Sequence, residues 1–119
     1  MPNVIYLSAP YSTPDPVERR RRVFQCQMVL ADFIADGRLT ICPIAMNHEA
    51  IELLNQRDLD AGGSYWRSIE EKLAEACDEL VVLRLPNWET SNGVRREIAL
   101  FEAMGKPVSF VDPRPIDGE

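Results

Sequence analysis

The stretch LVVLRLPNWETSNGVRREI, residues 80–98, decides the fold. It runs from an apolar segment, Leu80 to Leu85, through a turn of small polar residues and glycine into a helical pattern. The first amides of a helix are unpaired and point toward the preceding loop, so a turn of this kind can bind an anion. Glu97 lies one turn into the helix, six residues after Ser91. The same residues also suit an ordinary capped helix with a solvated glutamate.

Outward from this stretch, apolar runs alternate with helical patterns. The expected strands span residues 4–7, 39–42, 78–85 and 106–111, and the expected helices span 16–36, 45–55, 64–76 and 92–104. Capping signals support the ends: Asp15 precedes Pro16, and Gly37 and Gly105 follow helical patterns. The strands are continuous apolar runs, which predicts one α/β domain over residues 1–119, with a parallel sheet covered by helices on both faces.

Ligands bind beyond the carboxyl ends of the strands in sheets of this kind. Residues 8–12, 42–48 and 86–93 each follow an expected strand. We therefore expect these three segments to converge on one crevice.

Composition limits the possible partners. The 45% hydrophobic and 27% charged residues are typical of a soluble globular domain. No apolar run approaches the roughly 20 residues needed to cross a bilayer, and the N-terminus has no signal-peptide pattern, so we expect a cytoplasmic protein without a membrane partner. A net charge of −6 argues against a nucleic acid polymer as partner and requires a local positive field for any small anion.

The metal-ligating residues are few. Cys26, Cys42 and Cys77 are odd in number and irregularly spaced, and His48 is the only histidine. They form no credible zinc set and no disulfide framework. We expect the cysteines to pack as small apolar residues, and no metal or other cofactor.

Two loops carry most of the candidate binding residues. Ser91, Asn92 and Gly93 would hold a phosphate through the Ser91 hydroxyl and the helix amides, although plain N-capping explains them equally. In the first loop, Ser8 and Ser12 offer hydroxyls that turn chemistry also explains. Tyr11, in the same loop, would stack on a base or orient a carboxylate.

Arginines supply the candidate positive field. Arg19 to Arg22 form a run at a helix start, and four consecutive residues cover every side of a helix, so at most two face the crevice; Arg22 is the candidate. Arg95 and Arg96 raise the same question beside Ser91, where one would neutralise a phosphate and the other be exposed.

Four further side chains have both a structural and a functional interpretation. Trp66 and Glu70 share a helix face, where the tryptophan suits a core or interface as well as a base platform. His48 is either structural or a ligand contact, and Trp88 either closes over a ligand or packs.

Taken together, the chain resembles the nucleoside 2-deoxyribosyltransferase superfamily, in a branch of short proteins related to the 2′-deoxynucleoside 5′-phosphate N-hydrolases. The resemblance covers nearly the whole chain. It rests on residues 6–12 (YLSAPYS), 42–44 (CPI) with His48, 65–66 (YW), 77–80 (CDEL), 85–94 (LPNWExSxGV, where x is any residue), 97–99 (EIA) and 105–108 (GKPV).

The resemblance implies a three-layer flavodoxin-like (Rossmann-like) domain with a mostly parallel sheet of four or five strands, usually a homodimer or larger. It implies cleavage or transfer at the N-glycosidic bond of a nucleoside or nucleotide, with no cofactor. Glu97 would be the nucleophile, oriented by Tyr11, and Glu70 would protonate or bind the base. Ser91, at the place of a phosphate-binding serine, would hold a 5′-phosphate with help from Ser12 and Arg22.

One departure from the superfamily pattern matters. Relatives carry Asp where this chain carries Glu70, eight residues before Asp78. The extra methylene moves the carboxyl group, and reaction geometry is sensitive to such a displacement. A nucleotide-binding or nucleotide-sensing protein without turnover is therefore the alternative hypothesis, because a fold does not fix a function.

Overall fold

The computed structural model describes residues 2–115. Strands and helices alternate, as the sequence predicts. The elements are β1 (Val4–Ser8), α1 (Pro16–Ala35), β2 (Leu39–Ile41), α2 (Pro43–Gln56), α3 (Gly63–Ala76), β3 (Glu79–Leu83), α4 (Asn92–Ala103) and β4 (Val108–Val111).

The four strands form one sheet in the order β2-β1-β3-β4, and every pairing is parallel. Tyr6, at the centre of β1, pairs with Ile41 on one side and Leu80 on the other. The order matches the first four strands of a flavodoxin-like sheet. The predicted α/β, flavodoxin-like class is therefore confirmed, with four strands.

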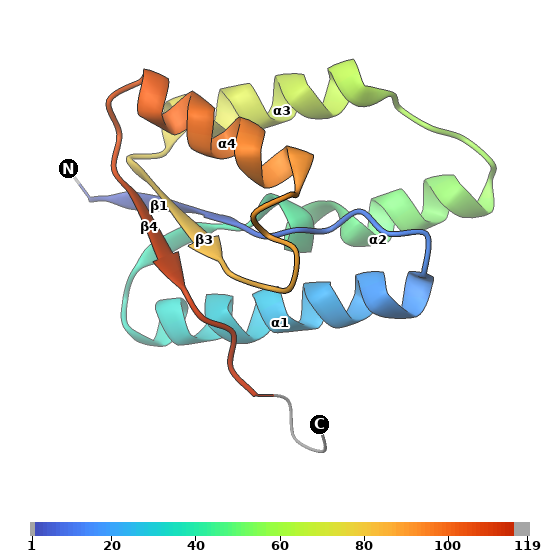
Figure 1. Ribbon diagram of the computed structural model, residues 1–119, viewed down its shortest axis with the longest axis horizontal. Helices are drawn as coiled ribbons and strands as arrows, with labels where there is room; N and C mark the ends of the chain where they lie inside the picture. The colour runs from blue at the N-terminus through green and yellow to red at the C-terminus, as the bar shows by residue number, and fades with distance from the viewer. Residues whose placement is uncertain (1, 116–119) are drawn as a thin grey trace.

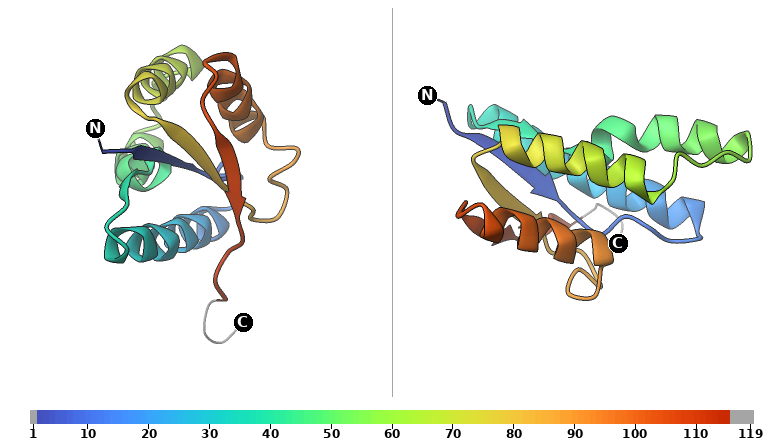
Figure 2. Two further views of the ribbon diagram at one scale, coloured as in Figure 1. Left: turned by 90° about the vertical axis from the view of Figure 1, so that its left-hand side faces the viewer. Right: turned by 90° about the horizontal axis from the view of Figure 1, so that it is seen from above.

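Helices cover both faces of this sheet. In Figure 1, α3 and α4 lie above the strands and α1 lies below them, and Figure 2 shows the same three layers from the side. Ile5 and Leu7 belong to a core with α1, whereas Tyr6 and Val82 belong to a second core with α3 and α4. The alternation of strand side chains between the two faces explains why the runs are apolar throughout.

The predicted capping residues end the helices as expected. Asp15 accepts a hydrogen bond from the Val17 amide at 3.0 Å before α1. Gly37 and Gly105 follow α1 and α4 with φ of +76° and +69°, a conformation that glycine adopts without steric cost.

Several predicted boundaries are wrong by one or two residues; the central strand β3, for example, spans Glu79–Leu83 and not residues 78–85. Helix α2 begins at Pro43, not at Ala45, because proline is accommodated in the first turn, where its missing N–H costs nothing. Helix α3 begins at Gly63, with Gly62 as its cap. Strand β4 begins at Val108, two residues after Lys106.

The cysteines pack as the composition predicts. Cys26 and Cys42 are buried in the core beneath α1, and Cys77 is buried in the core beneath α3 and α4. All three are free thiols.

Candidate active site

A cavity of about 650 Å³ opens at the carboxyl ends of β1 and β3. Strand β1 is followed by α1 on one face of the sheet, and β3 is followed by α4 on the other, so the loops diverge between the two strands. Each of the three segments contributes to the wall, through residues 9–12, residues 43, 44 and 47, and residues 87 and 90–93. The convergence of these three segments is confirmed by the fold.

Glu97 is a buried carboxylate on the wall of this cavity. Its side chain belongs to the first turns of α4, and only 8% of the residue is exposed. The Ser8 hydroxyl, at the end of β1, donates a hydrogen bond to Glu97 Oε1 at 2.7 Å. Burial raises the pKa of Glu97 to about 7, with a further increase from Glu70, while Tyr6, Ser8 and Arg96 act in the opposite direction. The group therefore changes charge close to neutral pH.

Tyr6 lies beside Glu97 on the same wall. Its ring is fully buried against Phe101, with the ring centroids 5.4 Å apart. Burial, and then the charge of Glu97, raise the pKa of the Tyr6 hydroxyl. The hydroxyl has no hydrogen-bond partner of ordinary geometry among residues 2–115. The same hydroxyl lowers the pKa of Glu97, so the two groups interact on this wall.

Glu70 joins α3 to α4 through an ion pair. Both of its carboxylate oxygens accept hydrogen bonds from Arg96 Nη2, each at 3.2 Å. Both residues line the cavity, and the charge of Glu70 contributes to the raised pKa of Glu97. In this arrangement Glu70 presents hydrogen-bond acceptors to the cavity.

The loop before α4 has the geometry of a helix cap. Ser91 Oγ accepts a hydrogen bond from the Val94 amide at 3.3 Å. Ser91, Asn92 and Gly93 all line the cavity. A Cβ added at Gly93 would meet only Ser91 Oγ, at 4.0 Å, so the packing of the protein does not require glycine there. Any such requirement has to come from a ligand.

Trp88 packs in the same loop without contributing to the cavity wall. Its ring contacts Phe110 of β4, with centroids 5.2 Å apart. It is partly buried against the core under α4. Of the two interpretations of Trp88, packing is therefore the one that the structure supports.

Tyr11 lines the cavity and forms a hydrogen bond with His48, which lies outside the cavity wall. The Tyr11 hydroxyl and His48 Nδ1 are 2.8 Å apart, and the histidine is buried and does not line the cavity. Burial, and then the charge of Glu52, raise the pKa of Tyr11. The structure thus differs from the expectation that Tyr11 orients Glu97, because the Tyr11 hydroxyl bonds to α2 while Ser8 bonds to Glu97.

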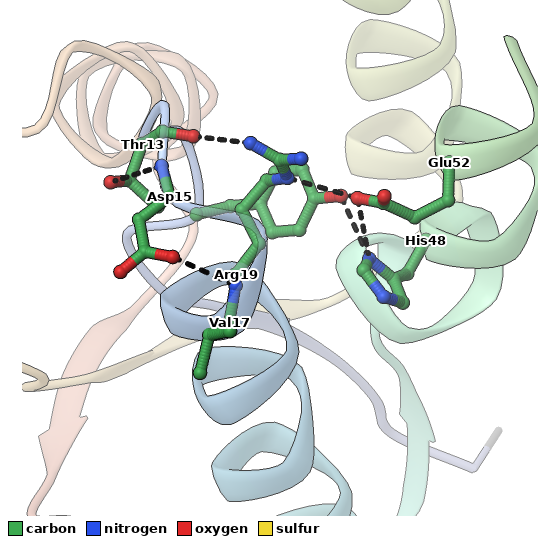
Figure 3. A network of polar contacts seen from close by, with 7 residues as sticks. Thr13, Asp15, Val17, Arg19, His48 and Glu52 are labelled. Atoms are coloured by element: carbon green, nitrogen blue, oxygen red, sulfur yellow. Dashed lines mark hydrogen bonds and ion pairs between the residues drawn. The ribbon is translucent and has the colours of Figure 1, made fainter. Parts of the chain in front are cut away.

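Figure 3 shows the polar network around His48. Arg19 Nε donates to Glu52 Oε1 at 2.9 Å, and that oxygen lies 4.0 Å from His48 Nδ1. Arg19 also donates to the carbonyl of Thr13. Because Glu52 and Tyr11 approach the same imidazole nitrogen, the group is not a relay of the Ser-His-Asp type, which uses both nitrogens. It fixes the loop between β1 and α1.

Arg22, Ser12 and Trp66 complete the predicted set, and all three line the cavity. Arg22 is not free: it donates to Glu18 at 3.2 Å and to the Ser12 carbonyl at 3.2 Å. Trp66 packs edge-on against Tyr65, with centroids 5.0 Å apart.

Tyr6 is the site residue that the sequence interpretation missed. It stands in the expected apolar strand of residues 4–7, and the sequence alone gives it no role in the site. The available signal was its spacing from Ser8, because residues two apart in a strand share a face. A tyrosine on the face of a polar residue at a strand end is expected to aim its hydroxyl at the same place.

The side chains of the cavity suit organic acid–base and nucleophilic chemistry. Among residues 2–115, no three His, Cys, Asp or Glu side chains form a group able to hold a metal ion. In that same part of the chain, no helix combines the length and apolarity that spanning a membrane requires.

Comparison with known proteins identifies a family. Residues 3–112 match the family described as a domain of unknown function, DUF1937, and the chain belongs to this family. No curated protein matches the sequence.

Proposed function

We propose that this member of the DUF1937 family is an enzyme that cleaves the N-glycosidic bond of a (deoxy)nucleoside or its 5′-monophosphate, through a covalent glycosyl–Glu97 intermediate. The observation that carries the proposal is Glu97 itself: a buried carboxylate on a cavity wall, held by Ser8, with its pKa raised to about 7. Strongly perturbed carboxylates in clefts are typical of catalytic groups.

The first step breaks the glycosidic bond between the sugar and the base. A carboxylate oxygen of Glu97 forms a bond to the anomeric carbon as the carbon–nitrogen bond breaks, and the electron pair leaves with the base. The base nitrogen takes up a proton, either from Glu70 or from solvent. Water, or the nitrogen of a second base, then attacks the anomeric carbon, and the bonding pair returns to the Glu97 carboxylate. Any proton on the attacking atom passes to solvent.

Other features support this chemistry. The resemblance to nucleoside 2-deoxyribosyltransferases assigns the nucleophile to the position of Glu97 and a phosphate contact to Ser91. The cavity of about 650 Å³ falls within the range typical of small-molecule sites. Tyr11 and Trp66 offer rings to a base on its wall. A homodimeric or larger assembly and a cytoplasmic location remain part of the proposal.

The test is base release. The purified protein is incubated with a panel of nucleosides and 5′-monophosphates, and free base is measured by chromatography. Wild type is expected to release base from at least one compound, and Glu97→Ala from none. The matched control is Glu102→Ala, a change on the same helix at an exposed position, which should leave release unchanged. A folded Glu97→Ala variant with wild-type release refutes the proposal.

A second candidate, a nucleotide-binding protein without turnover, has one observation in its favour. Arg96 occupies both oxygens of Glu70, so this carboxyl has to leave the ion pair before it protonates a base. This candidate predicts thermal stabilisation by a nucleotide, about 2.7 kcal/mol at a hundredfold excess over Kd, without product. Turnover that disappears in Glu97→Gln would exclude it.

A further inference from the structure

Three guanidinium groups line the cavity, and they differ in what they contact. Arg22 is paired with Glu18, and Arg96 is paired with Glu70. Arg67, in the first turns of α3, lines the same cavity but makes no ion pair and no side-chain hydrogen bond with any residue between 2 and 115. It is therefore the cavity cation that gives up no protein partner when it binds an anion.

The position of Arg67 follows from the packing of α3 on α4. Each helix precedes a strand of the parallel sheet, so the two helices run in the same direction. The Glu70–Arg96 ion pair joins them at 3.2 Å. Arg67 lies three residues before Glu70, and Gly93 lies three residues before Arg96, which is a rise of about 4.5 Å along each helix. Arg67 therefore lies across the cavity from the start of α4.

The side chain of Arg67 is folded back along its own helix. Arg67 Nη1 lies 2.8 Å from the place where a Cβ on Gly63 would stand. The absence of a side chain at Gly63 leaves the guanidinium room between the first turn of α3 and the cavity. The residue is exposed at the rim of the cavity, so it can reach a ligand without breaking an ion pair or hydrogen bond.

A cation without a carboxylate partner would favour the binding of a phosphorylated ligand in this cavity. Glu97 and Glu70 are both acidic, and the chain as a whole carries a net charge of −6, so a phosphorylated ligand meets repulsion unless a local charge offsets it. Arg22 and Arg96 are already paired with Glu18 and Glu70.

We propose that Arg67 is the residue that selects phosphorylated over unphosphorylated substrates, by binding the 5′-phosphate from α3 while the Ser91 hydroxyl and the first amides of α4 bind it from the other side. This inference rests on the proposed function for its substrate class. A planar guanidinium binds phosphate oxygens in pairs, so Arg67 adds orientation as well as charge. The phosphate would thereby fix the distance of the sugar from Glu97.

The experiment compares one ratio in three proteins. The ratio is kcat/KM for a 2′-deoxynucleoside 5′-monophosphate divided by kcat/KM for the matching nucleoside. In Arg67→Gln it should fall about 10- to 100-fold, the loss expected for a charge-assisted phosphate contact, with the nucleoside rate within about twofold of wild type. Arg95→Gln is the matched control, since Arg95 carries the same charge beside the same loop but does not line the cavity. Its ratio should stay at the wild-type value.

Two further results separate a bound phosphate from a general field. Arg67→Lys keeps the charge but not the fork, and it should restore part of the ratio. An equal fall for monophosphate and nucleoside in Arg67→Gln, or an equal fall in ratio for Arg95→Gln, overturns the inference.

Binding provides a readout that does not depend on turnover. If no compound releases base, the proposed function fails, and thermal shift with the same monophosphate and nucleoside then decides the inference alone. Greater stabilisation by the monophosphate in wild type, lost in Arg67→Gln and kept in Arg95→Gln, supports it. Equal stabilisation of wild type and Arg67→Gln, or no shift with either compound, overturns it.

Discussion

Two glutamates near the cavity have opposite environments. Glu97, on α4, is buried and accepts a hydrogen bond from the neutral Ser8 hydroxyl, and burial raises its pKa to about 7. Glu52, on α2, is partly exposed and accepts from Arg19 at 2.9 Å, a hydrogen bond that lowers its pKa. The surroundings of Glu97 destabilise its ionised form, whereas those of Glu52 stabilise its ionised form.

The two environments suit different roles, one in a reaction and the other in supporting the structure. A group whose charged form is destabilised by its surroundings gains from reacting or from binding a cationic centre, such as the anomeric carbon in a glycosidic transition state. A group neutralised by a fixed arginine gains nothing further. In the proposed reaction Glu97 is therefore the reacting group, whereas the Arg19–Glu52 pair, with His48 and Tyr11, supports the opposite wall of the cavity.

The largest expected effect is that of Glu97→Gln. Base release should fall at least about a thousandfold, because an amide neither attacks nor leaves. At high pH, by contrast, the variant should be more stable relative to wild type than it is at low pH. The folded-state pKa of about 7 exceeds the ordinary 4.5, so the folded wild type keeps a proton that the unfolded chain loses, and its free energy of unfolding falls as pH rises through this window. The expected loss is about 3 kcal/mol.

Denaturant unfolding at pH 5 and pH 8 measures this effect. Wild type should lose stability relative to Glu97→Gln between the two values, since glutamine does not titrate. Glu52→Gln serves as the contrast: a lowered pKa stabilises the fold above the ordinary pKa, and this contribution disappears as pH falls through the folded value. Parallel curves for wild type and Glu97→Gln would remove the distinction between the two glutamates.

Ser8→Ala should give the next largest effect. The Ser8 hydrogen bond lowers the pKa of Glu97 against the effect of burial, so its removal raises that pKa above about 7. For a bond worth about 1.4 kcal/mol, the ionised fraction and hence kcat at pH 7 should fall about fivefold, and the rate should recover at higher pH. A pH–rate profile makes the measurement. An unshifted acid limb would show that Ser8 does not control the charge of Glu97.

Tyr11→Phe tests the opposite wall. It removes the hydroxyl that bonds to His48 and leaves the ring, so the free energy of unfolding should fall by about 1 kcal/mol. Because the Tyr11 hydroxyl makes no bond to Glu97, kcat should stay within about threefold of wild type and the pH–rate profile should not move. A hundredfold lower kcat with a shifted acid limb would instead assign Tyr11 to the orientation of Glu97.

The fold was predictable because its signals are local. Continuous apolar runs such as residues 80–83 indicate strands buried on both faces, and Asp15, Gly37 and Gly105 mark helix ends through their own backbone preferences. The edge at which the loops converge follows from parallel strands alone. The errors at Pro43 and Gly63 are errors of one to two residues, where a cap depends on its neighbours.

The site was only partly predictable, for a reason that the two tyrosines illustrate. The sequence places Tyr6 within β1 and Tyr11 in the loop after it, but which of the two side chains lies beside Glu97 depends on side-chain packing. His48, 37 residues from Tyr11, takes the Tyr11 hydroxyl, and Phe101 holds the Tyr6 ring beside Glu97. Contacts between residues so distant in the chain leave no spacing signal in a single sequence.

Arg19→Gln should have the smallest effect, and it tests the environment of Glu52 alone. The variant leaves Glu52 without its cation, so the pKa of Glu52 should return toward its ordinary value. The stabilisation that ionised Glu52 provides near neutral pH, and loses in acid, should therefore diminish. Partly exposed ion pairs contribute little, so we expect a lower Tm than wild type, by less than in Tyr11→Phe, with base release unchanged. Thermal melts at pH 4 and pH 7 provide the test. A large loss of activity would mean that the frame around Tyr11 participates in the reaction that we assign to the side of Glu97.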